Sequence, residues 1–550
     1  MKSLIEKYKE NKLEFLFLIA LVGCLLCQLF ITLYFNVFEA KEHMGIDVSW
    51  EYLKANIAFK ERAFYPSDVI NTTTQPMFER HILILPFYLI FKNVFVAYGL
   101  SSFFITVACL VVLYKIGTSL KLTFGQKLII LNLFICPFMA NGFNIDNDLG
   151  YFVCVNGFGA MQNVSTLTIL MVILSVVFDG NSKHKKIIEI ATLALIVFIG
   201  VSKGTSLLVW IGVPMAIYIV TQVFIKNDIK FLISKTSIFM YASVVGVLLG
   251  RIIGGILGYQ YLDSSVTWAN ASEIMKNLGN VLVGVPLLLG GIPGEGVERS
   301  PMSFIGLVYC FGLIMSIVLV VAILYFTVQT IKAIIKEKSA DDRVLFLLVV
   351  FFANIAVYAF LVPYHVGATF EIRYLIPAIH SGFVLIGLFI KEIDDSLIIK
   401  KFGCVMLLIS VIAMDLYSDY FLAITDNSQW QTDQLLAAID DTDAGLVYFW
   451  DEEKYLVRPE RVIRVIDSSR VYKSISYGNV LENFGDYKYY DDSKQYVGAT
   501  VLVTVAGQEP LEKAIMEQYE LLENIGDYSV YYCSENPIDL ESMTIKNKEL

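Results

Sequence analysis

The chain has 550 residues, of which 56% are hydrophobic and 17% are charged, and its mean hydropathy is +0.63. Soluble domains carry about 25% charged residues, so this composition excludes a soluble globular protein. The formal net charge is −10, and nothing in the sequence resembles the basic patch of a nucleic-acid-binding domain. The 8 cysteines follow neither a metal-binding spacing nor a disulfide framework.

Apolar runs separated by short charged loops recur along the chain, which is typical of a polytopic helical membrane protein. Lysines precede the first run, and Lys-rich loops then alternate with acidic ones. Because positive residues favour the cytoplasmic side, we expect a multi-pass plasma-membrane protein with a cytoplasmic N-terminus and about 11 transmembrane helices. The expected spans are 13–35, 94–116, 128–139, 159–177, 187–201, 206–224, 237–257, 304–331, 344–362, 374–390 and 402–423.

The segments between the spans suggest two domains. Residues 1–424 form the expected transmembrane domain, including an outer loop at 36–93 whose short apolar stretch suits the membrane interface. A second sizeable outer loop is expected at 258–302. Residues 425–550 are predicted to form a small extracytoplasmic α/β domain, with strands at 446–450, 500–505 and 528–532 and a helix at 509–522. The expected fold class is therefore mainly α, with a small α/β domain at the C-terminus.

The first outer loop carries the sharpest candidate for catalysis, Asp47. A loop carboxylate can accept a proton from a hydroxyl or bind a divalent cation. Glu51 lies four residues further on, so in a helix both acids would share one face, and each would raise the pKa of the other. Trp50 and Tyr52 offer flat faces of the kind that pack on sugar rings. The alternative is that Asp47 merely caps a short helix.

The next outer loop contains a second pair of acids, Asp146 and Asp148. Alternating Asp and Asn residues provide suitable oxygen ligands for Mg²⁺ or Ca²⁺. They are also ordinary turn formers, and no calcium-binding loop of the EF-hand type follows them. Both interpretations stay open.

Two later positions could bind a phosphate at the outer boundary. Arg373, between Glu371 and Tyr374, could fork onto a phosphate while Tyr374 anchors at the headgroup level. Arg373 could equally be a snorkelling residue that stabilises a helix end. Lys203 lies in a tight outer hairpin, where it is either a contact for an anionic lipid phosphate or a plain surface lysine.

Three short motifs resemble the GT-C class of integral-membrane glycosyltransferases, particularly its bacterial members. In these proteins the first outer loop reads approximately Gly-x-Asp-x-Ser-Trp-x-Tyr, then Phe-Gly-x-Asp, then Gly-Pro, and a late span carries Arg-Tyr-x-x-Pro. The matching residues here are Gly45-Ile46-Asp47-Val48-Ser49-Trp50-Glu51-Tyr52, Phe64-Tyr65-Pro66-Ser67-Asp68, Gln75-Pro76 and Arg373-Tyr374-Leu375-Ile376-Pro377. Tyr65-Pro66-Ser67 and Gln75 depart from the glycine pattern of the class.

The resemblance implies a specific chemistry. A sugar would pass from a polyprenyl-phosphate donor to a glycan, lipid or polymer acceptor of the cell envelope, on the outer face and with inversion. Asp47 would be the base or a metal ligand, with Asp146 or Asp148 as the second-loop acid and Mg²⁺ or Mn²⁺ as the cation. Arg373 and Lys203 would bind the lipid phosphate. The remaining substrate-binding candidates are Trp50, Glu51, Tyr52, Asp68, Glu371 and Tyr374.

Two other classes of protein remain as alternatives. An envelope polysaccharide polymerase or ligase usually relies on Arg and His in two large loops, whereas the acid here comes early in the chain. A lipid or polysaccharide transporter would place ionisable groups in the middle of the membrane and would show an internal repeat. Asp47 and the C-terminal outer domain favour the transferase.

Overall fold

The computed structural model describes residues 12–39, 70–71, 80–135, 160–178, 185–257, 260–261, 268–292, 300–361, 374–392, 405–414, 416, 430–450, 462–466, 497–507 and 511–538. The chain divides into two compact units, which are described separately. The first comprises Met1–Tyr34, Ser102–Ile252 and Ser264–Thr425, and the second Phe35–Ser101, Ile253–Asp263 and Asp426–Leu550. One division falls next to the predicted boundary at 424, while 35–101 and 253–263 group with the C-terminal part. The assignment of 425–550 as an independent outer domain stays a prediction.

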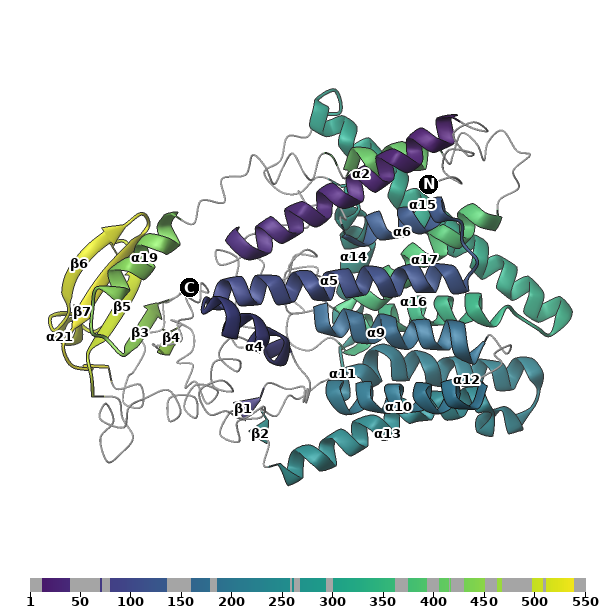
Figure 1. The fold of residues 1–550 in the computed structure, drawn as a ribbon, viewed down its shortest axis with the longest axis horizontal. Helices are drawn as coiled ribbons and strands as arrows, with labels where there is room; N and C mark the ends of the chain where they lie inside the picture. Colours follow the sequence, from purple (N-terminus) through teal and green to yellow (C-terminus); the bar gives the residue numbers. More distant parts are fainter. Residues whose placement is uncertain are drawn as a thin grey trace. The chain divides into compact units, whose positions relative to one another are not determined.

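Each predicted span contains a helix. In Figure 1 the axes of most helices of the first unit are roughly aligned, whatever the direction of the chain along them. Within the described part of the chain, six helices are long and apolar enough to cross a membrane. These helices and the C-terminal sheet confirm the predicted fold class, whereas the span count of about 11 stays a prediction. The helices are α2 (Lys12–Tyr34), α5 (Val94–Ser119), α6 (Phe124–Ile135), α9 (Ala160–Val172), α10 (Lys185–Lys203), α12 (Val213–Lys226), α13 (Lys235–Ile256), α15 (Phe304–Glu337), α16 (Asp342–Leu361), α17 (Ile376–Glu392) and the shorter Val405–Met414.

Polar contacts fix the direction of α12 against α16. Near one end, the Gln222 side-chain amide and the Tyr218 hydroxyl both donate to Oδ1 of Asp342, at 2.6 and 2.8 Å. Near the other end, Asn354 Nδ2 donates to the carbonyl of Trp210 at 3.1 Å, within a π-helical turn that precedes α12. Residue numbers fall along one helix as they rise along the other, so α12 and α16 are antiparallel.

Close glycine contacts join α10 to α13. A methyl group on Gly246 would lie 2.5 Å from the carbonyl oxygen of Val197 and 2.9 Å from Cα of Gly200. Gly250, one turn further along α13, meets Val201 in the same way. Glu189 and Lys235 form an ion pair near the starts of the two helices. The two helices are therefore parallel, and their backbones touch through a Gly-x-x-x-Gly face.

The expected loop at 258–302 was wrong in part, because it contains the helix α14 (Ala271–Leu288). Asn270 and Glu273 form a reciprocal capping box, in which each side chain accepts from the backbone N–H of the other. The buried residues recur every three or four positions, which is the period of a helix buried on one face. They are Asn277, Val281, Gly284 and Leu288.

The second unit contains the helix α4 (Arg80–Phe91), with Pro86 inside it, where the sequence predicts a short interfacial segment. Two short strands, β1 (Ile70–Asn71) and β2 (Gln260–Tyr261), pair in parallel in the same unit. The helix is confirmed, and its place at the membrane interface stays a prediction.

The C-terminal part is a five-stranded sheet in the order β4-β3-β5-β7-β6. β3 pairs in parallel with β4 and β5, while β7 pairs antiparallel with β5 and β6. Leu435, Leu436 and Ile439 of α19 (Trp430–Asp440) pack on one face of the sheet. The predicted strands are confirmed. The strands are β3 (Leu446–Trp450), β4 (Val462–Ile466), β5 (Thr500–Val505), β6 (Glu520–Ile525) and β7 (Tyr528–Cys533).

The predicted helix at 509–522 was largely wrong. Among the described residues of this range, which begin at 511, only α21 (Lys513–Met516) is helical, and Glu520–Ile525 is the edge strand β6. A two-residue turn, Gly526-Asp527, joins β6 to β7, and Gly526 has a φ of 56°. Glycine at the first position of such a turn favours a hairpin. On the sheet, the Tyr519 hydroxyl lies 3.0 Å from Oγ1 of Thr500, and burial raises the pKa of this phenol.

Candidate functional site

Two of the predicted site residues, Lys203 and Tyr374, belong to the described part of the structure. The other candidates lie outside the described residues: Asp47, Trp50, Glu51, Tyr52, Asp68, Asp146, Asp148, Glu371 and Arg373. The described helices nevertheless show where several of the segments that carry these residues begin.

Lys203 lies at the end of the first unit where α16 finishes. It is the last residue of α10, and the chain turns directly from it into the helix that continues as α12. Because α12 and α16 are antiparallel, this turn is at the same end as Leu361, the last residue of α16. Beyond Leu361 come Glu371 and Arg373 in sequence, and the described chain resumes at Tyr374.

The end of α6 lies at this same end of the unit. The ring of Phe134 is 4.9 Å from that of His380 on α17. A methyl group on Gly387, two turns further along α17, would lie 2.5 Å from Cδ1 of Ile130. The helices α6 and α17 are therefore antiparallel, so α6 ends beside the start of α17. Asp146 and Asp148 follow the end of α6 in sequence.

The first helix, α2, finishes at this end as well. Asn132 of α6 donates a hydrogen bond to the carbonyl of Leu21 at 3.1 Å, and Gly125, earlier on α6, faces Leu18, earlier on α2. This order makes α2 and α6 parallel. The last residue of α2, Tyr34, thus lies at the end of the unit where α6, α10 and α16 also finish. The sequence predicts that this end is on the outer side of the membrane.

Lys203 is buried, with 6% of its surface exposed, so the alternative of a plain surface lysine is wrong. Gly204 follows it with a φ of 62°, and the Ser206 hydroxyl donates to the Lys203 carbonyl at 3.0 Å. A buried ammonium in an apolar bundle is costly unless an anionic or carbonyl group faces it. Contact between Lys203 and a lipid phosphate stays a prediction.

Asn163 is a candidate that the sequence analysis missed. It lies in the first turns of α9 and is 3% exposed, and its Nδ2 has no hydrogen-bond partner among the described residues. Phe178, beyond the other end of α9, contacts Tyr218 and Phe346, so Asn163 lies at the same end of the unit as Lys203. A buried amide donor there could hold a phosphate oxygen. An Asn at the start of an otherwise apolar run was the available signal.

A metal site is not assembled by the residues that the structure describes, since these contain no cluster of three His, Cys, Asp or Glu side chains. The predicted ligands Asp47, Asp146 and Asp148 lie outside that part of the chain. Carboxylate oxygens are the donors that Mg²⁺ and Mn²⁺ prefer, so the residue types fit and the metal stays a prediction.

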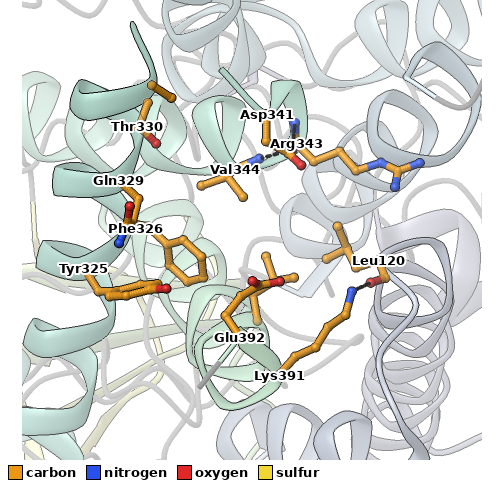
Figure 2. Close-up of a pocket in the computed structure, with 12 residues that line it drawn as sticks. Leu120, Tyr325, Phe326, Gln329, Thr330, Asp341, Arg343, Val344, Lys391 and Glu392 are labelled. Carbon is orange, nitrogen blue, oxygen red and sulfur yellow. Dashed lines mark hydrogen bonds between the residues drawn. The ribbon is translucent and has the colours of Figure 1, made fainter. Parts of the chain in front are cut away.

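A cavity of about 370 Å³ lies at the opposite end of the same helices. α15, the start of α16 and the last turn of α17 line it, and Figure 2 shows the Tyr325 hydroxyl directed toward the carboxylate of Glu392. α17 has 17 residues, so this cavity is separated from Tyr374 by about 25 Å of helix. It is distinct from the predicted transfer site.

Two solved structures share the fold of this chain over nearly its whole length. ArnT from Cupriavidus metallidurans bound to undecaprenyl phosphate has a TM-score of 0.54 and 10% sequence identity, and the match covers 94% of this chain and 97% of that chain. The apo state of the same protein matches with a TM-score of 0.52 and 10% identity over 93% and 97% of the two chains. No protein-family model matches the sequence, and no curated protein does. The predicted resemblance to the GT-C class is confirmed at the level of the fold.

Proposed function

We propose that this protein is a membrane glycosyltransferase that moves a sugar from a polyprenyl-phosphate donor to an acceptor of the cell envelope. The observation that carries the proposal is the fold shared with ArnT bound to undecaprenyl phosphate, along 94% of this chain. That protein holds the lipid phosphate that such a donor releases. The common end reached by α2, α6, α10 and α16 supports the same site, because the candidate acids and cations follow or terminate these helices.

The chemistry is a single displacement at the anomeric carbon. The acceptor hydroxyl oxygen forms the new bond to this carbon while the bond from the carbon to the phosphate oxygen breaks, so the configuration inverts. Asp47 takes the hydroxyl proton as general base. The electron pair of the broken bond goes to the lipid phosphate, whose growing charge Arg373 and Lys203 stabilise. A divalent cation, when bound by Asp146 or Asp148 with Asp47, would add further positive charge there.

The other candidates hold the sugar. Trp50 and Tyr52 supply aromatic faces, while Glu51, Asp68 and Glu371 accept hydrogen bonds from hydroxyl groups. Tyr374, half-buried at the start of α17, lies at the headgroup level. These roles place the reaction at the outer face of the membrane, with the N-terminus in the cytoplasm.

The proposal is tested by turnover of the purified protein with a panel of polyprenyl-phosphate sugars, with and without Mg²⁺ or Mn²⁺. Release of polyprenyl phosphate from one donor supports the transferase and names the sugar. If only a lipid-linked oligosaccharide is consumed, the protein is a polymerase or ligase. If a lipid is bound and moved with no bond broken, it is a transporter.

The variant Asp47→Asn should reduce transfer by at least about 100-fold, because general-base catalysis contributes about 10²–10⁴ in rate. Membrane insertion and the thermal unfolding temperature should stay unchanged. Asp441→Asn, an exposed change of the same kind beyond α19, should leave turnover as in the wild type. Wild-type turnover in Asp47→Asn would remove this carboxylate from the mechanism.

A further inference from the structure

The cavity at the end of the first unit away from the predicted transfer site combines charged, polar and aromatic groups from several helices (Figure 2). Its volume of about 370 Å³ lies within the usual range for small-molecule sites. Tyr325, Phe326 and Gln329 of α15 form one wall. Sequence charge bias places this end in the cytoplasm.

Two of the four charged side chains that line the cavity, Asp341 and Lys391, make hydrogen bonds that hold them in place. Asp341 caps α16, since its Oδ1 accepts from the backbone N–H groups of Arg343 and Val344 at 2.8 and 3.1 Å. The Lys391 ammonium donates to the carbonyl of Leu120, just past the end of α5, at 3.0 Å. The guanidinium of Arg343 extends away from the aromatic wall in Figure 2. These contacts leave Glu392 as the charged group without an assigned role.

Glu392 is in the last turn of α17, and no hydrogen bond or ion pair reaches its carboxylate from the residues that the structure describes. Lys391 is its neighbour in sequence, yet the two side chains do not pair. Figure 2 shows the Glu392 carboxylate on the hydroxyl side of Tyr325. The Tyr325 ring is held at 5.2 and 5.4 Å from the rings of Phe326 and Phe389.

These groups favour a cation. A carboxylate and an aromatic face both attract ammonium groups. The helix α17 finishes at this cavity, and α5 finishes one residue before Leu120, which lines it; helix C-termini carry partial negative charge. The Lys391 ammonium has three donors and uses one of them on Leu120, so it can also contact an anion close to the bound cation. The complementary ligand carries an ammonium next to a phosphate.

We propose that this cavity binds a phosphoethanolamine group, with Glu392 as the counter-ion of the ammonium, Tyr325 as its aromatic wall and Lys391 as the contact for the phosphate. The group could belong to an ethanolamine phospholipid of the cytoplasmic leaflet or to a soluble phosphoethanolamine. Either source presents the same chemistry. The site lies outside the proposed sugar-transfer site and does not depend on it.

The test is native mass spectrometry of the purified full-length protein, titrated separately with phosphatidylethanolamine and phosphatidylglycerol of identical acyl chains. The wild type should bind the ethanolamine lipid at least about tenfold more tightly, and Glu392→Gln should remove roughly tenfold of that affinity, as expected for a hydrogen bond to a charged group. Glu337→Gln, an exposed change at the end of α15 outside the cavity lining, is the matched control and should bind as the wild type.

Tyr325→Leu, which removes the aromatic wall and keeps every charge, provides a second variant if Glu392→Gln fails to fold. It should also weaken the ethanolamine lipid selectively. Displacement of the lipid by millimolar phosphoethanolamine would identify a soluble source, and its failure to displace would identify the lipid. Equal binding of the two lipids by the wild type, or equal losses in Glu392→Gln and Glu337→Gln, would overturn the proposal.

Discussion

The residue that most clearly joins distant parts of the bundle is Asp342, which accepts from both Tyr218 and Gln222. The Tyr218 ring also packs edge-on against Phe346, with the ring centres 5.5 Å apart. A carboxylate with two donors can lose one and keep the other, so the network should weaken without collapsing.

Tyr218→Phe should therefore lower the free energy of unfolding by about 1.5 kcal/mol, the size of one hydrogen bond to a charged group. The ring packing is preserved in this variant. Unfolding in mixed micelles, titrated with a denaturing detergent, measures the change. Tyr241→Phe, on the exposed side of α13, is the control and should be neutral. A loss as large in the control would show that the hydroxyl of Tyr218 is not what holds α12 to α16.

At the same scale, the sequence identified which residue types could carry the chemistry, while their surroundings depend on contacts between distant segments. Lys203 was placed correctly in a tight hairpin, but its burial follows from the neighbouring helices, which no local pattern reports. For Asn163 the sequence does show a signal, an Asn at the start of an apolar run. That residue becomes a candidate only because the structure buries it.

At the scale of the element, α10 and α13 are held by backbone contact between glycines, and this predicts opposite effects of one substitution at two places. Gly246→Ala would push its methyl group into the Val197 carbonyl and Gly200, where backbone must move, and should cost roughly 1–3 kcal/mol. Gly255→Ala, further along α13, meets nothing within 4 Å and should be neutral or slightly stabilising.

The thermal unfolding temperatures of the two glycine variants in one detergent make the comparison. Similar shifts in both would indicate that α10 and α13 do not pack through Gly246. The ion pair between Glu189 and Lys235 is partly exposed and should contribute little.

Helices and strands were predictable from the sequence where a single local property, such as a long apolar run, determined the structure. A run of about 20 apolar residues leaves helix as the available spanning structure, so the spans were found from composition. The helix α14 was missed because its apolar residues form only a stripe and its start depends on a two-residue capping box. At β6, Glu and Leu favour helix locally, but pairing with β7 through the Gly526 turn outweighs that preference.

At the scale of the whole molecule, the alternation of helix directions predicts which ends share a side of the membrane. Ser272, in the first turn of α14, lies at the predicted outer end, since Asn277 of α14 bonds to the carbonyl of Ala359 near the end of α16. Ser339, in the turn between α15 and α16, lies at the predicted inner end.

In intact cells, Ser272→Cys should react with a membrane-impermeant maleimide and Ser339→Cys should not, until the membrane is broken. Both serines are exposed, so the pair is matched. The wild type gives the background from its own cysteines. The reverse pattern would invert the topology and would place the phosphoethanolamine cavity, rather than the sugar-transfer end, on the outside.

The position of α6 has a consequence for how the protein is made. Its described helix of 12 residues spans about 18 Å, shorter than a bilayer core of about 30 Å, and all eight residues from Leu128 to Ile135 are buried. The helix α17 packs against α6. Lys391, in the last turn of α17, donates a hydrogen bond to the carbonyl of Leu120 in the turn that precedes α6, and these two residues are 271 positions apart in sequence. Since α6 packs on both α2 and α17, we expect it to reach its final position in the bundle only after α17 has been synthesised. A chain truncated before residue 376 would lack this packing partner and should be less stable than the full-length protein.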